Sequence, residues 1–205
     1  MTLDRPPAAV LFDMDGVIVD TFDAWVAVLD ECRARRGMTP LGPGPVREFW
    51  GQGLHADCVN FFPGETPEVL AREYSEGFAR HIDRVRPEPG AEDAVRRLAR
   101  AGVALALVTN SPLAMARRIL DLVGLRAEFG VIAGGDEVAQ GKPAPDLLHL
   151  ATRRLGTTAD RAVMVGDTQL DVDAARAVPM FVVGYRLAGD ARVERMDELP
   201  GILGF

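Results

Sequence analysis

Two aspartates separated by one residue follow an apolar run near the start of this sequence. Ala8 to Phe12 has no polar side chain, and Asp13-Met14-Asp15-Gly16 comes directly after it. An unbroken apolar run that contains Val and Phe predicts a strand buried on both faces, as in a parallel sheet. Like charges this close together make folding costly. A polar turn closed by Gly16 is the simple alternative. We expect instead a site at the carboxyl edge of the sheet, with a metal ion and a nucleophilic carboxylate.

Other polar side chains also stand where predicted strands end. Thr109 and Asn110 follow the second predicted strand, Lys142 follows the third after a loop, and Asp167 follows the fourth. The carboxyl ends of parallel strands lie along one edge of a sheet, so these groups can converge. Asp171 is four residues beyond Asp167, at a predicted helix start, and this spacing can set both carboxylates on one face.

The chemistry that these residue types allow is phosphoryl transfer. Three carboxylates around one point repel each other unless a cation lies among them, and hard oxygen ligands select Mg²⁺. A phosphate can bridge that ion to Thr109, to the amides of a helix that starts near Ser111, and to Lys142. Lys142 is the only lysine in a chain with 23 basic residues, which indicates a specific need for an ammonium group.

The sequence that must position these residues shows two kinds of pattern. Residues 17–85 have helical periodicity, with amphipathic helices predicted over 21–36 and from Thr66 onward. A Pro-rich linker over 86–90 follows, and strands then alternate with helices. Helices between strands imply right-handed crossovers and a parallel sheet. We predict an α/β fold with a Rossmann-like, five-stranded parallel core.

The predicted domain division follows from this change of pattern. Residues 1–16 and 86–205 form the α/β catalytic core, and residues 17–85 form an inserted, all-helical cap. A chain of 205 residues is long enough for a core domain with such an insert.

The four polar segments resemble the four motifs of the haloacid dehalogenase superfamily, in the same order. They are Asp13-Met14-Asp15-Gly16, Thr109-Asn110, Lys142-Pro143, and Gly166-Asp167 through Asp171. The helical insert after the first motif resembles the small cap of the phosphoglycolate phosphatase-like branch. Each motif alone is weak, but all four in order span nearly the whole chain.

This resemblance implies a role for each residue. Asp13 would attack phosphorus to form an aspartyl-phosphate, and Asp15 would act as the general acid and base. Thr109, Asn110 and Lys142 would hold the phosphoryl group. Metal ligands would come from Asp13, the backbone carbonyl of Asp15, Asp167 and Asp171, with Asp171 close by or in an outer position. Aspartate at position 15 implies a phosphatase or a phosphomutase, because the dehalogenases lack it and the ion pumps have threonine there.

The cap of such enzymes supplies the groups that recognise the rest of the substrate. Arg47, Trp50, Gln52 and His55 flank the Gly51-Gln52-Gly53 turn, which resembles the Gly-Asn-Gly cap turn of phosphoglycolate phosphatases. Arg47 could clamp a substrate carboxylate through two hydrogen bonds. The alternative, an exposed surface arginine and a packed tryptophan, stays open at this point.

The function predicted from these residues is Mg²⁺-dependent hydrolysis of a small, phosphoglycolate-like phosphomonoester. A sugar-phosphate mutase of the β-phosphoglucomutase type shares all four motifs and is the first alternative. A phospho-receiver signalling module also uses aspartates, Thr and Lys on a five-stranded sheet, but its phosphorylated Asp follows the third strand. A binding protein without activity is disfavoured because every catalytic group is present.

The composition limits the partners and the compartment. The net charge of −7 disfavours binding to nucleic acid or to an anionic membrane, and no apolar run reaches the roughly 20 residues of a membrane span. Cys32 and Cys58 have no metal-ligand spacing, and Met1 to Pro7 lacks the build of a signal peptide. We expect a cytoplasmic monomer or homodimer whose partner is a small phosphorylated metabolite.

Overall fold

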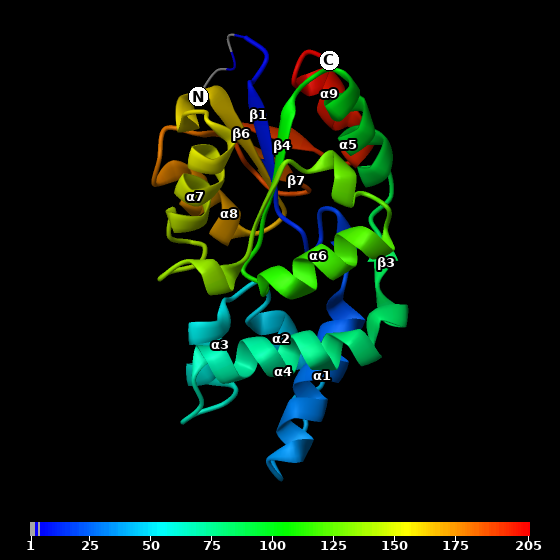
Figure 1. Cartoon of the computed structure of the whole chain (residues 1–205), viewed down its shortest axis with the longest axis vertical. Helices are drawn as coiled ribbons and strands as arrows, with labels where there is room; N and C mark the ends of the chain where they lie inside the picture. Colours follow the sequence, from blue (N-terminus) through cyan, green and yellow to red (C-terminus); the bar gives the residue numbers. More distant parts are fainter. Residues whose placement is uncertain (1–2, 4) are drawn as a thin grey trace.

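The computed structural model contains a six-stranded parallel sheet with helices on both faces (Figure 1). It describes residue 3 and residues 5–205. The strand order is β5-β4-β1-β6-β7-β8. The bounds of these strands are β1 Ala9–Phe12, β4 Ala104–Val108, β5 Val131–Ala133, β6 Ala162–Gly166, β7 Phe181–Tyr185 and β8 Ala191–Val193. The predicted α/β class and Rossmann-like parallel core are therefore confirmed.

The sheet has one strand more than the five predicted, because β8 adds to its edge. The chain returns past β7 after Tyr185, where the amide of Asp190 donates to the carbonyl of Val182. It then runs parallel to β7, with Val183 opposite Ala191. Residues 191–193 are Ala-Arg-Val, and their side chains range from buried to exposed. A strand this short and this partly buried has no clear periodicity in the sequence.

The central strands bury both faces because helices cover each of them. Successive strand residues point to opposite sides, so Val10 and Phe12 belong to one apolar cluster and Ala9 and Leu11 to the other. Three helices beside the sheet contribute to the first cluster, which also includes buried residues from 17–85: α5 Ala91–Arg100, α6 Leu113–Leu122 and α9 Leu199–Ile202. Those that contribute to the second are α7 Asp146–Leu155 and α8 Gln169–Arg176.

Four helices lie between the first strand and the rest of the sheet in sequence. They are α1 Phe22–Arg35, α2 Pro43–Glu48, α3 Leu54–Asn60 and α4 Pro67–Arg80. Figure 1 shows them gathered below the sheet. The helix α4 begins as predicted, with Thr66 capping the amide of Val69 and proline at the first helical position. The sequence analysis did not resolve α2 and α3, which flank the turn at residues 51–53.

A short antiparallel ribbon joins the two ends of this helical segment. Its strands are β2 Val19–Asp20 and β3 Arg86–Pro87, and Val19 lies opposite Pro87. Further single turns of 3-10 helix occur at Ile82–Arg84, Arg126–Glu128, Gly135–Glu137, Ala159–Arg161 and Met196–Glu198. Within the described residues, no helix combines the length and the apolar character that crossing a bilayer requires. Met1, Thr2 and Asp4, part of the segment without signal-peptide character, lie outside the described residues.

The central strand β1 sets the stability of the sheet. Leu11 is completely buried between β4 and β6. We expect Leu11→Ala to lower the free energy of unfolding by roughly 3 kcal/mol, because a core cavity adds to the lost burial. Urea unfolding followed by circular dichroism measures this change. Leu122→Ala, at a side chain that is 52% exposed, is the matched control and should change stability little. Equal effects of the two variants would contradict this account.

Candidate functional site

The loop after β1 places the first two aspartates at the carboxyl edge of the sheet. The amide of Asp13 donates to the carbonyl of Val165 at 2.9 Å, which continues the pairing of β1 with β6. The amide of Gly16 donates to the carbonyl of Val19 at 2.7 Å. Gly16 has a φ of 84°, and a Cβ there would collide with the carboxylate of Asp167. Glycine is therefore required at position 16, both for its backbone conformation and for this close approach.

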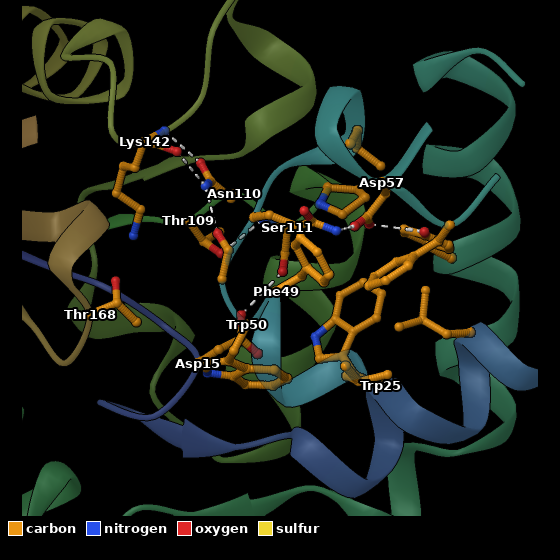
Figure 2. Close-up of a pocket in the computed structure, with 18 of the residues that line it drawn as sticks. Asp15, Trp25, Phe49, Trp50, Asp57, Thr109, Asn110, Ser111, Lys142 and Thr168 are labelled. Atoms are coloured by element: carbon orange, nitrogen blue, oxygen red, sulfur yellow. Dashed lines mark hydrogen bonds between the residues drawn. The ribbon is translucent and has the colours of Figure 1, made fainter. Parts of the chain in front are cut away.

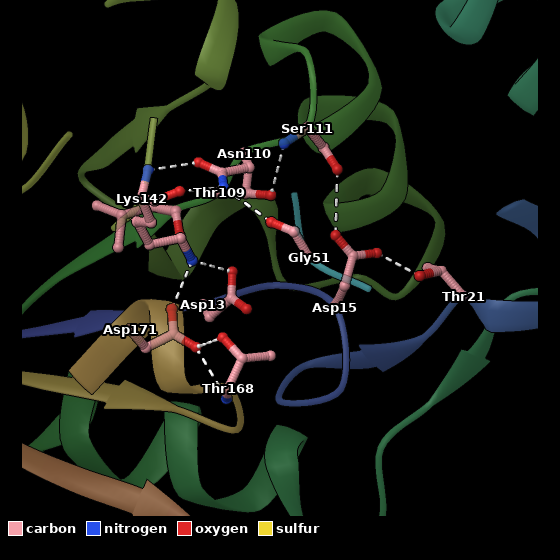
Figure 3. Close-up of polar contacts among 11 residues, drawn as sticks. Asp13, Asp15, Thr21, Gly51, Thr109, Asn110, Ser111, Lys142, Thr168 and Asp171 are labelled. Carbon is pink, nitrogen blue, oxygen red and sulfur yellow. Dashed lines mark hydrogen bonds and ion pairs between the residues drawn. The ribbon is translucent and has the colours of Figure 1, made fainter. Parts of the chain in front are cut away.

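Lys142 lies between two of the aspartates (Figure 3). Its Nζ is 2.6 Å from Oδ1 of Asp13 and 2.6 Å from Oδ1 of Asp171, and it also donates to the carbonyl of Val108 at 3.2 Å. The Lys142 side chain is 3% exposed. The only lysine of the sequence therefore has three acceptors at the base of the site. It is a buried residue and not a surface residue.

Three carboxylates form an acidic cluster beside this lysine. Asp13, Asp167 and Asp171 each offer an oxygen, and these oxygens lie within 4.8 Å of one another. Both oxygens of Asp171 have donors, since Oδ1 accepts from Lys142 and Oδ2 accepts from the amide and hydroxyl of Thr168. In contrast, Oδ1 of Asp167 is buried and has no hydrogen-bond partner among the described residues. A buried carboxylate oxygen without a donor fits a cation that prefers oxygen ligands.

The electrostatics of the cluster favour such a cation. The pKa of Asp167 is raised to about 7, mainly by burial and then by the charge of Asp171, while Lys142 opposes the shift. Burial also raises the pKa of Asp13, which Lys142 lowers and the neighbouring carboxylates raise. Although burial lowers the pKa of Lys142, Asp13 and Asp171 outweigh it and raise that pKa. One ammonium group thus faces three carboxylates, which leaves an excess of negative charge.

Asp15 is held apart from this cluster. Its Oδ2 accepts a hydrogen bond of 3.1 Å from the hydroxyl of Ser111, and its Oδ1 accepts one from the hydroxyl of Thr21. Burial raises the pKa of Asp15, and these two hydrogen bonds oppose the shift. A raised pKa suits a group that gives and takes a proton. These two hydrogen-bond donors of Asp15 were not predicted from the sequence, in which Thr21 and Ser111 stand only near predicted helix starts.

Asn110 connects the lysine loop to the turn between α2 and α3. Its Oδ1 accepts from the amide of Lys142 at 2.7 Å, and its Nδ2 donates to the carbonyls of Lys142 and Gly51 at 2.9 and 2.8 Å. Thr109 lies one residue earlier, and its hydroxyl accepts from the amide of Ser111 at 3.0 Å. The structure therefore brings Thr109, Asn110 and Lys142 together at one end of the pocket.

A pocket extends from these residues toward the helical segment (Figure 2). Asp13, Asp15, Thr109 and Lys142 line one end, and Trp50 and Gln52 are among the lining residues farther along. Arg47 does not line this pocket. It is exposed, and its guanidinium lies 4.1 Å from the centre of the Phe22 ring. His55 lines a neighbouring hollow beside the lysine loop. The structure therefore brings only Trp50 and Gln52, of the predicted cap residues, into the main pocket.

The sequence analysis also missed Asp57, which lines the same pocket. The residue is 8% exposed, and its carboxylate accepts from Nε2 of Gln52 at 2.5 Å and from the hydroxyl of Tyr74 at 2.9 Å. Burial raises its pKa to about 7, although both hydrogen bonds lower it. Asp57 is three residues after Leu54 and four before Phe61, both buried. That helical spacing on an apolar face was a usable signal in the sequence.

The fold and the site define an α/β enzyme with an acidic, lysine-containing centre at the carboxyl edge of a parallel sheet. The model for haloacid dehalogenase-like hydrolases matches residues 10–185. The chain belongs to this family. The match agrees with the resemblance in the four motifs, and it leaves the phospho-receiver alternative without support.

Known proteins match most of this chain. A phosphoglycolate phosphatase from Cupriavidus necator is 34% identical over 98% of this chain and 95% of its own length. An N-acetylmuramic acid 6-phosphate phosphatase from Pseudomonas aeruginosa is 31% identical over 82% of this chain and 76% of its own length. The structure of a β-phosphoglucomutase from Clostridium difficile has a TM-score of 0.81 at 19% identity, covering 94% of this chain and 93% of that one. This last similarity concerns the fold alone.

The raised pKa of Asp57 predicts a pH-dependent cost of folding. The pKa is about 7 in the folded chain against 3.8 for an unperturbed aspartate, so the folded state retains a proton that the unfolded state loses. This contribution to stability is present at low pH and is lost as the pH rises through 7. Asp57→Asn does not titrate at this position. We expect the stability difference between variant and wild type to move by about 2 kcal/mol in favour of the variant from pH 5 to pH 8.

Chemical unfolding at several pH values measures this difference. Asp83→Asn is the matched control, because Asp83 is exposed and follows α4. A stability difference for Asp57→Asn that stays constant with pH would show that burial does not shift this carboxyl group.

Proposed function

We propose that this protein, a phosphatase of the haloacid dehalogenase-like family, hydrolyses a small phosphomonoester with Mg²⁺ through an aspartyl-phosphate on Asp13. The observation that carries this proposal is the contact of Lys142 with Asp13, beside Asp167 and Asp171, at the end of a pocket. Named phosphatases among the relatives support the reaction class. Phosphoglycolate, the substrate in one of those names, is the first compound to test.

The proposed reaction begins with attack by Asp13. A carboxylate oxygen of Asp13 forms a bond to phosphorus as the bond from phosphorus to the leaving oxygen breaks. Asp15 gives its proton to that leaving oxygen. Water then attacks the aspartyl-phosphate, Asp15 takes a proton from this water, and the bond between phosphorus and Asp13 breaks. The raised pKa of Asp15 and its fixed position between Thr21 and Ser111 suit both proton transfers.

Lys142, Thr109 and Asn110 position the phosphoryl group in this proposal. The ammonium of Lys142 contacts Asp13, so it can neutralise charge on the nucleophile and on a phosphoryl oxygen at the same place. Thr109 and Asn110 line the same end of the pocket. The hydrogen bonds of Asn110 to the backbone of Lys142 keep the lysine loop in place.

The residues present fit a magnesium ion. Asp13, Asp167 and the backbone carbonyl of Asp15 would hold it, and Asp171, whose oxygens already accept from Lys142 and Thr168, would lie in an outer position. The buried Oδ1 of Asp167 that lacks a donor supports this assignment. The ion would neutralise charge on the phosphoryl group and the nucleophile.

We further propose that the protein is a cytoplasmic monomer or homodimer and that residues 17–85 form its cap.

Removal of divalent metal tests the metal requirement. We expect treatment with a chelator to abolish phosphate release from small phosphomonoesters, because the carboxylates at the site repel both each other and the phosphate. Added Mg²⁺ should restore the release, which a phosphate assay measures. Circular dichroism before and after metal removal checks that the fold is retained. Full turnover after exhaustive removal of metal would contradict the role of the ion.

Substitution of the only lysine tests the centre of the site. Lys142→Arg keeps the charge, but a guanidinium is wider and fixes its donors in a fork. It has to fit between Asp13 and Asp171, each 2.6 Å from the present Nζ. A displacement of about 1 Å can cost roughly 100-fold in rate, so we expect a fall in kcat of at least that size with the fold intact. Arg153→Lys, at an exposed position on α7, is the control. Near-normal turnover of Lys142→Arg would contradict the proposed role of Lys142 in the reaction.

A sugar-phosphate mutase remains the second candidate because it shares all four motifs, and the β-phosphoglucomutase structure has the same fold. Isomerisation of glucose 1-phosphate without phosphate release would favour it. The relatives from Cupriavidus necator and Pseudomonas aeruginosa, both above 30% identity, are named phosphatases, which supports hydrolysis as the main proposal.

A further inference from the structure

The pocket has two chemically different ends. Asp13, Asp15, Thr109 and Lys142 line the end at the sheet, which the proposed reaction uses. The other end enters the helical segment, and its apolar lining residues include Leu29, Val46, Phe49, Leu54 and Phe61. Asp57 lies among them, across the pocket from Lys142 in Figure 2. Of the described residues that line this pocket, Lys142 is the only cation, and it is committed to Asp13 and Asp171.

Asp57 retains the capacity to accept further hydrogen bonds. A carboxylate has about four acceptor positions, and the donors recorded for Asp57 are Nε2 of Gln52 and the hydroxyl of Tyr74. No ion pair of Asp57 with a cation occurs within the described part of the chain. A buried carboxylate without a cation is costly among apolar side chains. A ligand that donates a hydrogen bond to this group would recover part of that cost.

We propose that Asp57 binds the leaving group of the substrate by accepting a hydrogen bond from a hydroxyl or ammonium group. This inference rests on the proposed phosphatase function, and it defines the class of substrate. The phosphoryl group would occupy the end at Lys142, and the alcohol part would extend between the aromatic rings toward Asp57. A substrate with a carboxylate in that place would be disfavoured.

Charge explains why a carboxylate fits poorly. It would place a second anion near Asp57 in surroundings from which water is largely excluded, where like charges repel strongly. Arg47, the predicted clamp for a carboxylate, lies outside this pocket on the Phe22 ring. Hydroxyl and ammonium groups bring donors without negative charge, and the lining rings of Trp25 and Phe49 offer faces for a sugar or a cation.

A matched series of two-carbon phosphomonoesters tests this inference. Ethyl phosphate has no terminal donor, 2-hydroxyethyl phosphate has a hydroxyl, 2-aminoethyl phosphate has an ammonium, and phosphoglycolate has a carboxylate. The full chain is assayed with Mg²⁺ at pH 8, where Asp57 is largely ionised. We expect kcat/KM for at least one donor substrate to exceed that for ethyl phosphate by about 10-fold or more, with phosphoglycolate lowest. The better donor substrate distinguishes a hydroxyl-bearing from an ammonium-bearing leaving group.

Asp57→Asn tests whether this residue is the cause. The amide keeps the shape of the side chain but removes its charge, so the repulsion of phosphoglycolate disappears. We expect the ratio of kcat/KM between the better donor substrate and phosphoglycolate to fall by about 10-fold or more in this variant. The ratio should not change in Asp83→Asn, whose side chain is exposed and does not line the pocket. A ratio between substrates is informative even where the variant alters overall turnover.

Three results would overturn the inference. Equal kcat/KM of the wild type for all four compounds, or a preference for phosphoglycolate, contradicts it directly. An unchanged ratio in a folded Asp57→Asn variant contradicts the assignment to this residue. Absence of phosphate release from all four compounds and from p-nitrophenyl phosphate would contradict the proposed function itself, and the inference with it.

Discussion

The contact of Lys142 with Asp13 and Asp171 is the interaction on which the site depends. It joins the end of β1, the loop after β5 and the start of α8, which are far apart in the sequence. All three side chains are buried, and removal of one partner from a buried ion pair costs roughly 3–5 kcal/mol. Without the ammonium group, the neighbouring carboxylates would repel each other at this edge of the sheet. The ammonium group therefore supports both the fold and the proposed chemistry.

Glycines at two positions and one helix start allow these side chains to approach each other closely. A Cβ on Gly166 would collide with the side chain of Asp171, and one on Gly141 would collide with that of Asn110. Thr168 is the N-cap residue of α8, and its amide and hydroxyl both donate to Oδ2 of Asp171, which orients that carboxylate. Local helix capping and site geometry are thus produced by the same hydrogen bonds. The loops are fixed because their side chains and amides satisfy one another.

The helical segment contributes to the pocket by two separate contacts. From the side of the sheet, Asn110 donates a hydrogen bond to the carbonyl of Gly51. Within the helical segment, Asp57 accepts a hydrogen bond from the side chain of Gln52. The turn at residues 51–53 is therefore fixed at both of its sides. Asn110, which anchors the lysine loop, therefore also anchors a turn whose residues Gly51 and Gln52 line the pocket.

The sequence by itself determined the parallel sheet and most of the candidate site. Apolar runs located five strands, and the polar residues at their ends, Asp13, Thr109, Lys142 and Asp167, converge because parallel strands end at one edge. Only the tertiary structure decided the outer contacts. It placed Arg47 on Phe22, brought Asp57 into the pocket, and set Thr21 and Ser111 on Asp15. Periodicity describes one element at a time, whereas these contacts depend on how helices from distant parts of the chain pack together.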